Sequence, residues 1–378
     1  MTQNTFSPLF ESYRLNNGVE VSNRLVVAPM THFASHADGT LSDEERHFLY
    51  NRAENIGLFI TAATLVAEGG KAFVGQPEAI YTKQLDSLKE TAKLIQSQGA
   101  KAILQIHHGG NQSLPDLLNG RDLVTASDDP QTDARALTGE EVENLVQSFA
   151  HAADLALQAG FDGVEIHGAN GYLIQQFVSA QTNRRTDKWG ENRYAFSSAI
   201  VDAIVAVRDK HCRPDFIIGY RFSPEEPGAN GITMQDTFGL IDVLVKKPLQ
   251  YLHVSLWDFY KLARRGSDET KTRIKQIHQR IAGRLPLIGV GNLYTAEQIL
   301  AAYQTGWAEF IALGKAVMIN PNIATLIKDG RTDEIVTELD PDKADRYGIP
   351  DYLWQLCIQG GAWLPPVKGQ ANRGTVDI

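Results

Sequence analysis

A histidine, an asparagine and a tyrosine lie close together in the segment HGANGY, residues 167–172, directly after a short apolar run. His167 and Asn170 can both donate a hydrogen bond to one carbonyl oxygen, and two such donors stabilise negative charge that develops on that oxygen. Tyr172 is a weak acid just beyond them that can give a proton to carbon. An isolated histidine is more often a core residue bonded to the backbone, so the surrounding motifs must decide between the two interpretations.

Polar and glycine residues also follow most of the other short apolar runs. The third run contains Gln105 and leads into residues 107–110 (HHGG), and the fifth continues into Arg221. Loops that only connect elements would supply turn-forming residues, but fewer His, Gln and Arg side chains. The segments 289–292 (GVGN) and 314–315 (GK) follow the last two runs. Glycine there permits a phosphate to approach the backbone N–H groups closely.

Eight short apolar runs, each followed by a helical pattern, predict the elements that position these side chains. The runs are nearly continuous in apolar residues, which is typical of strands buried on both faces. They are residues 24–28, 57–61, 102–106, 163–166, 216–220, 251–255, 287–290 and 309–313. Capping-box spacings at residues 42–45, 138–141 and 295–298 predict helix starts between them. We therefore predict an α/β fold, a (β/α)8 TIM barrel, with a doubly wound open sheet as the alternative.

The carboxyl ends of barrel strands form one face, so the polar residues that follow the strands are expected to meet there. We predict a single domain over residues 1–378, with a C-terminal extension from about residue 340 that packs on the barrel. Trp354 and Trp363 in this extension suggest a contact with a neighbouring subunit in a homo-oligomer. Two long connections, 111–137 and 168–191, are predicted to be functional or disordered loops.

Composition excludes several classes of protein. The chain carries 45 acidic and 36 basic residues, a net charge of −9, which disfavours a nucleic-acid partner because phosphate contacts need a surplus of Lys and Arg. No apolar run is long enough to predict a membrane span, and the N-terminus lacks the pattern of a signal peptide. Cys212 and Cys357 are the only cysteines, so we expect inert thiols and no iron–sulfur centre. We therefore expect a cytoplasmic protein with neither a membrane partner nor a metal.

These segments resemble the Old Yellow Enzyme family of FMN-dependent ene reductases over roughly residues 6–322. The densest part is GFDGVEIHGANGYLIQQFVSAQTNRRTDKWGENR, residues 160–193. The resemblance implies noncovalently bound FMN, NADH or NADPH as the reductant, and a small enone-type substrate. It also implies that His167 and Asn170 bind the substrate carbonyl, and that Tyr172 protonates the α-carbon after hydride reaches the β-carbon.

The resemblance implies a set of residues for the flavin ring. It places Pro29, Met30 and Thr31 against the ring, and Gln105 and Arg221 at its pyrimidine edge. The Gln105 amide can both donate and accept there, and the fixed charge of Arg221 would stabilise a reduced ring. Some relatives have cysteine at the position of Thr31, so tuning of the redox potential by a thiol is not expected here.

The FMN phosphate is expected at the loops after the seventh and eighth runs, as is common in TIM barrels. Gly291, Asn292, Gly314 and Lys315 are the residues in question. The family usually has arginine where Lys315 stands. Lysine keeps the positive charge but lacks the planar guanidinium group of arginine, which predicts weaker retention of FMN. Asn111 is a second departure, because many relatives have arginine there.

Some polar residues have two open interpretations. His107 and His108 are consecutive, so their side chains diverge on a strand. The resemblance puts His108 at the family histidine position, where a contact with flavin or substrate and the lack of one are both open. Arg184, Arg185 and Asp187 would line the rim of the site or form a solvated charged loop.

We therefore predict an NAD(P)H-dependent flavin oxidoreductase that reduces activated C=C bonds of α,β-unsaturated carbonyl compounds with ping-pong kinetics. Flavin-dependent reduction of quinones or nitro compounds is an alternative. A phosphate-binding barrel lyase or isomerase without flavin belongs to a different class. A Schiff-base aldolase would need a strand-end lysine, and no central run supplies one. A catalytically idle flavin-binding protein is disfavoured because His167, Asn170 and Tyr172 are all present.

Overall fold

Eight parallel strands close into a barrel. The computed structural model describes residues 4–361 and 363–370. The barrel strands are β3 (Leu25–Val27), β4 (Leu58–Ile60), β6 (Lys101–His107), β9 (Gly163–Gly168), β10 (Ile217–Phe222), β11 (Tyr251–Val254), β12 (Leu287–Gly289) and β13 (Phe310–Leu313). Each strand pairs with its neighbours in this order, and β13 pairs with β3 to complete the ring. The TIM barrel is confirmed and the open doubly wound sheet is wrong, because the ring of strands has no free edge.

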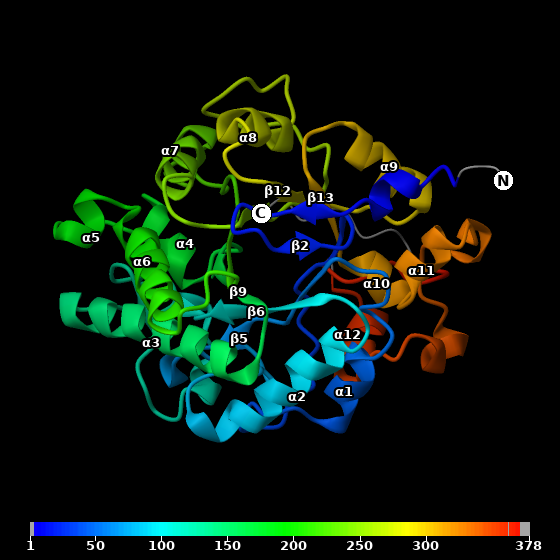
Figure 1. Ribbon diagram of the computed structural model, residues 1–378. Coiled ribbons are helices and arrows are strands. Elements are labelled where there is room, and N and C mark those ends of the chain that lie inside the picture. Colours follow the sequence, from blue (N-terminus) through cyan, green and yellow to red (C-terminus); the bar gives the residue numbers. More distant parts are fainter. Residues whose placement is uncertain (1–3, 362, 371–378) are drawn as a thin grey trace.

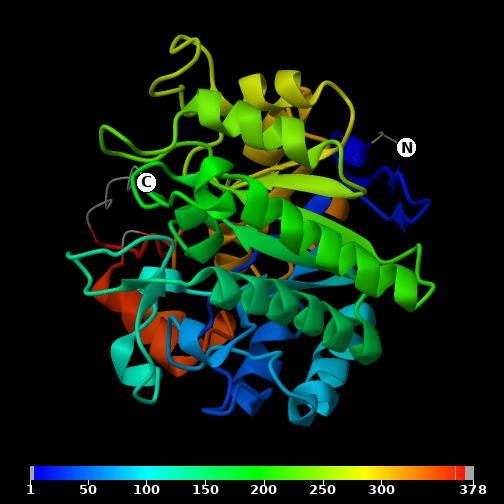
Figure 2. The same cartoon turned by 90° about the vertical axis from the view of Figure 1, so that its left-hand side faces the viewer.

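Helices surround the barrel on its outer side (Figure 1). They are α1 (Asp43–Leu49), α2 (Leu85–Gln96), α3 (Gly139–Ala159), α6 (Ala195–Lys210), α7 (Met234–Leu244), α8 (Arg273–Ile281), α9 (Ala296–Gln304), α10 (Lys315–Ile319), α11 (Ile323–Lys328) and α12 (Asp351–Gln359). Figure 2 shows the two long helices α3 and α6 lying side by side across the neighbouring strands. Their apolar faces pack against the strands and bury the outer layer of the core.

The predicted helix starts form because each has a side-chain cap. The hydroxyl of Ser42 accepts a hydrogen bond from the Glu45 backbone N–H at the start of α1. Thr138 and Glu141 form a reciprocal capping box at the start of α3, and Thr295 and Gln298 form another at the start of α9. These contacts satisfy backbone donors that a helix leaves free at its N-terminus.

The barrel interior is apolar at the amino ends of the strands. Inward-facing side chains include Val26, Ile103, Ile217, Ile288 and Phe310, which form one buried cluster. A short hairpin of β1 (Tyr13–Arg14) and β2 (Glu20–Val21) adds to the same cluster and covers this end of the barrel. The opposite end is therefore the open one.

Farther along the strands the interior becomes polar. Successive inward positions lie two residues apart, so β6 follows Ile103 with Gln105, and β10 follows Ile217 with Gly219 and Arg221. Glu165 on β9 pairs in register with Gln105 on one side and with Gly219 on the other. A buried polar layer thus lies between the apolar floor and the open end.

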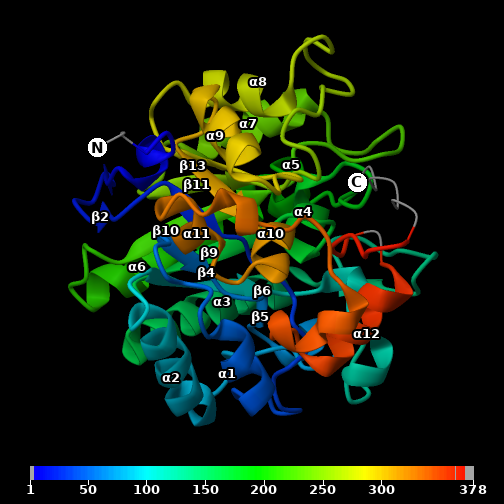
Figure 3. The ribbon, with the colours of Figure 1, turned by 90° about the vertical axis from the view of Figure 1, so that its right-hand side faces the viewer.

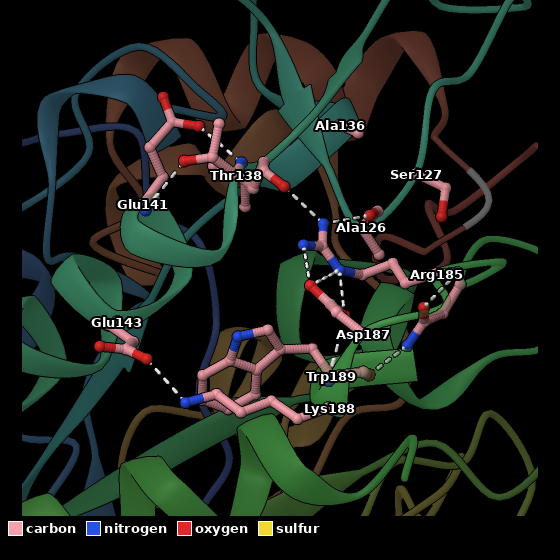
Figure 4. A network of polar contacts seen from close by, with 12 residues as sticks. Ala126, Ser127, Ala136, Thr138, Glu141, Glu143, Arg185, Asp187, Lys188 and Trp189 are labelled. Atoms are coloured by element: carbon pink, nitrogen blue, oxygen red, sulfur yellow. Dashed lines mark hydrogen bonds and ion pairs between the residues drawn. The ribbon is translucent and has the colours of Figure 1, made fainter. Parts of the chain in front are cut away.

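The two long connections contain short elements instead of disordered chain. Strands β7 (Val124–Thr125) and β8 (Arg135–Ala136) lie in the first, and helices α4 (Leu173–Val178) and α5 (Lys188–Glu191) in the second. Arg185 joins them: it pairs with Asp187 and donates to the carbonyl oxygens of Ala126 and Leu137 (Figure 4). Asp187 in turn caps α5 by accepting from the Trp189 N–H. Arg185 and Asp187 therefore hold two loops together, and the interpretation of Arg185 as a solvated side chain is wrong.

The C-terminal segment packs against the barrel near α1 (Figure 3). Leu353 and Cys357 of α12 are fully buried. Arg52, which follows α1, is buried and donates to the carbonyl oxygen of Tyr347. Burial raises the pKa of the Cys357 thiol to about 12, which keeps it protonated. The expectation of a single domain, and of an oligomer contact through this segment, stays a prediction.

The helices of residues 4–361 and 363–370 include none with the length and apolar character of a membrane span. Within the same residues, no group of His, Cys, Asp and Glu side chains is arranged to hold a metal ion.

Candidate active site

A cavity of about 460 Å³ opens at the carboxyl ends of the barrel strands. This volume is in the range of small-molecule binding sites. Most of the predicted site residues line it: Pro29, Met30, Thr31, Asn170, Tyr172, Arg221, Gly291, Asn292, Gly314 and Lys315. Gln105 and His167 do not line it, and both are buried in the barrel wall.

One part of the cavity combines close-approach glycines with a lysine. At Gly291, where φ is +142°, an added Cβ would stand 2.4 Å from the backbone nitrogen of Phe259. Lys315 Nζ lies 3.2 Å from the Asn292 Oδ1 and 5.1 Å from the centre of the Trp257 ring. Burial lowers the pKa of Lys315, and no carboxylate of the described residues pairs with it. An anionic ligand would therefore stabilise the charged form of this lysine.

Arg221 brings a second cation to the cavity, with an unused donor. Its Nη2 donates to the Ser255 hydroxyl at 3.1 Å, while its Nε is buried and has no hydrogen-bond partner. Burial lowers the pKa of Arg221, and the neighbouring Glu165 acts to raise it. A buried N–H without a partner costs free energy unless a ligand accepts from it.

Glu165 lies behind Arg221 and organises the buried polar layer. Gln105 Nε2 donates to Glu165 Oε1 at 2.8 Å, and His253 Nδ1 lies 2.9 Å from Glu165 Oε2. Burial acts to raise the pKa of Glu165, but His253 and Arg221 outweigh it and the pKa is lowered. The negative charge of Glu165 thus compensates the positive charge of Arg221 inside the barrel.

These features fit FMN. The buried Nε of Arg221 can meet the polar edge of a flat ring that gains negative charge. Lys315 can meet a phosphate, and Gly291 lines the cavity beside it, where the absence of a side chain lets its backbone pack against that of Phe259. Thr31 lines the same cavity and offers a hydroxyl to the ring.

His167 and Tyr172 form a compact cluster with His107. The His167 and Tyr172 ring centres are 5.3 Å apart, and the His107 ring lies 4.4 Å from Tyr172. Burial lowers the pKa of His167 well below its ordinary value and raises that of Tyr172. Because the backbone N–H of Ala169 donates to His167 Nδ1 at 3.3 Å, the proton of the neutral ring is on Nε2. Both side chains are neutral donors at pH 7.

The structure separates the two consecutive histidines. His107 shares the inward face of β6 with Gln105, and Gln76 Nε2 lies 3.1 Å from its Nδ1. His107 Nε2 is therefore the protonated nitrogen, and it is buried without a partner. His108 instead lines a different hollow, together with Arg121 and Arg135, and it is not among the residues that line the cavity.

Asn111 has a role within the loop. Its amide bonds Asp129 at 3.0 Å and Gln176 at 2.6 Å. This departure from the family pattern therefore lies outside the cavity lining.

The residues predicted from the sequence for this region did not include Glu165, His253 and Ser255. The alternation of inward and outward side chains along a strand could have identified all three. Glu165 lies two residues before His167, and His253 and Ser255 follow the inward-facing Tyr251 at the same spacing. Trp257, into which the sixth apolar run leads, also lines the cavity.

Comparisons with known proteins identify the family of this chain. The profile of the NADH:flavin oxidoreductase / NADH oxidase family matches residues 8–334. A probable NADH-dependent flavin oxidoreductase of Bacillus subtilis (strain 168) is 44% identical over 366 residues, which cover 95% of this chain and 98% of that protein. An NADH:fumarate oxidoreductase of Klebsiella pneumoniae (strain 342) is 35% identical over 93% of this chain, which spans only 39% of its length.

A solved structure supports the fold. The old yellow enzyme homologue from Zymomonas mobilis superimposes with a TM-score of 0.75 at 24% identity, and the match covers 91% of this chain and 99% of that one. The family match sets aside the lyase or isomerase alternative. FMN is the cofactor of this oxidoreductase, and NAD(P)H is its reductant. The chain belongs to the NADH:flavin oxidoreductase / NADH oxidase family, the Old Yellow Enzyme family whose motifs it carries.

Proposed function

We propose that the protein reduces the activated C=C bond of α,β-unsaturated carbonyl compounds. The observation that carries this proposal is that Asn170 and Tyr172 line the same cavity as Arg221 and Lys315, with the ring centre of His167 5.3 Å from that of Tyr172. Proton donors for a substrate thus share one cavity with the cations suited to the flavin. The Klebsiella relative, of which this chain spans 39%, is named for fumarate, a compound whose double bond is conjugated to two carboxylate groups.

His167 and Asn170 would bind the substrate carbonyl oxygen. The Nε2–H of His167 and the amide of Asn170 are neutral donors, and they stabilise the oxygen as it gains negative charge. Bound and reduced FMN supplies the hydride for the β-carbon. Tyr172 keeps its proton because burial raises its pKa, and it would give that proton to the α-carbon.

The nicotinamide and the enone would use this cavity in turn. A ligand that occupies the space beside Tyr172 excludes a second one there. We therefore propose two half-reactions at one flavin face, which give parallel lines in double-reciprocal plots.

Anaerobic spectroscopy tests the proposal. The purified protein, supplied with FMN, should be yellow, bleach with NADH or NADPH, and regain its colour with 2-cyclohexenone. Protein without a nicotinamide is the control and should stay oxidised. A protein that bleaches but does not regain its colour with any enone would contradict the substrate class, and intersecting double-reciprocal lines would contradict the ping-pong order.

A further inference from the structure

The side-chain amide of Asn170 is oriented by hydroxyl groups from two other strand ends. Its Oδ1 accepts from Ser255 Oγ at 2.8 Å and from Ser223 Oγ at 3.4 Å. Ser223 directly follows β10 and Ser255 directly follows β11. The two hydroxyls thus reach Asn170 from β10, which lies beside β9, and from β11, the next strand of the barrel.

Ser255 links Arg221 to the Asn170 amide. Arg221 Nη2 donates to Ser255 Oγ at 3.1 Å, and a guanidinium has donors only. Ser255 therefore accepts from Arg221, and its single proton is free to be donated to another group. In the structure, that proton goes to the Asn170 oxygen.

The backbone of Asn170 is fixed as well. Its φ is +59°, its N–H donates to Ser223 Oγ at 2.8 Å, and its carbonyl oxygen accepts from Gln112 Nε2 at 3.0 Å. Asn170 Nδ2, in contrast, has no hydrogen-bond partner in the described part of the chain, and the residue lines the cavity. This nitrogen is the group that remains free for a ligand.

We propose that Ser255 is a positioning residue for substrate binding. It holds the Asn170 amide with Nδ2 directed to the ligand, and it connects that amide to the positive charge of Arg221. Hydrogen bonds in such a chain polarise one another, so Nδ2 becomes a stronger donor than an isolated amide. This inference rests on the proposed function, in which the ligand of Nδ2 is the carbonyl oxygen of an enone.

Substitution of Ser255 tests the proposal in the FMN-loaded protein. The probe is 4-chlorophenol, whose oxygen resembles that of an enolate, and its Kd is measured by the change in flavin absorbance. Ser255→Ala should raise this Kd about tenfold, because the amide can then rotate and one charge-assisted chain is lost. Ser255→Thr keeps the hydroxyl and should restore binding. Ser255→Cys, a weaker donor, should fall between the two.

A double-mutant cycle separates this role from a general structural one. If Ser255 acts through Asn170, then Ser255→Ala should change the Kd less than about twofold in a protein that already carries Asn170→Ala. An equal loss in both backgrounds would overturn the inference, as would an unchanged Kd in Ser255→Ala alone.

FMN content and bleaching by NADH are measured in the same proteins. A wild-type protein that does not bind FMN overturns the proposed function, and the inference with it. A yellow Ser255→Ala protein that bleaches normally and binds the phenol as tightly as the wild type overturns the inference alone.

Discussion

Replacement of Lys315 should weaken FMN binding, and the structure allows the size of the loss to be worked out. Lys315 is a partly buried ammonium group in the cavity, next to the Asn292 amide and the Trp257 ring. A hydrogen bond between charged groups contributes about 1.5–3 kcal/mol. Lys315→Met removes one such bond to the phosphate, so the Kd of FMN should rise about 10- to 150-fold. Lys315→Arg keeps the charge and adds a planar fork, and it should bind FMN as tightly or more tightly.

The assay is the quenching of FMN fluorescence as the apoprotein is titrated. Lys275→Met is a matched control, because Lys275 also lies beside a tryptophan ring, Trp307, but outside the cavity. It should leave the Kd unchanged. The effect of Lys315→Met should shrink as ionic strength rises, since salt screens the interaction. A Kd for Lys315→Met within about twofold of the wild type would refute the assignment of Lys315 to the phosphate.

Three further predictions concern the proton donors and the glycine loop. Tyr172→Phe should slow flavin reoxidation by an enone at least about 100-fold and leave reduction by NADH unchanged in stopped-flow traces; equal slowing of both would contradict the proton-donor role. The rate of the enone half-reaction should not change between about pH 6 and about pH 9. The pKa of His167 is lowered, which keeps this histidine neutral above its usual 6.5, and the pKa of Tyr172 is raised, which keeps this tyrosine protonated below its usual 10.0. An inflection near pH 6.5 would show instead that His167 titrates. Gly291→Ala should destabilise the protein by about 1–3 kcal/mol in urea unfolding, since its Cβ meets backbone atoms, whereas Gly306→Ala, with positive φ but open space, should cost only about 1 kcal/mol.

The barrel could be predicted from sequence because its signals are local. A short apolar run in the sequence predicts each strand. The starts of helices α1, α3 and α9 are predicted by a capping residue and a partner three residues later. The end of α2 is less easily predicted: Gly99 has the positive φ, +102°, that is common just after a helix, but the helix ends at Gln96. Helix ends are less well specified because the last carbonyl groups can find several partners.

The two long connections were predicted less well. They contain β7, β8, α4 and α5, which are too short to show a hydrophobic period. Arg185 stabilises this region through carbonyl oxygens of Ala126 and Leu137, far away in the chain. No local pattern in the sequence identifies such a partner.

The sequence by itself determined the strands, their order along the chain, and the position of His167, Asn170 and Tyr172 at the carboxyl end of the fourth barrel strand, because each depends on neighbours a few positions away. Only the tertiary structure decided which histidine of the pair at 107–108 faces the site, which nitrogen of His107 carries the proton, and which way the Asn170 amide points. The physical reason is that burial and hydrogen-bond partners set these states, and the partners come from distant strands. Ser255 is 85 positions from Asn170 along the chain, yet its hydroxyl lies 2.8 Å from the Asn170 oxygen.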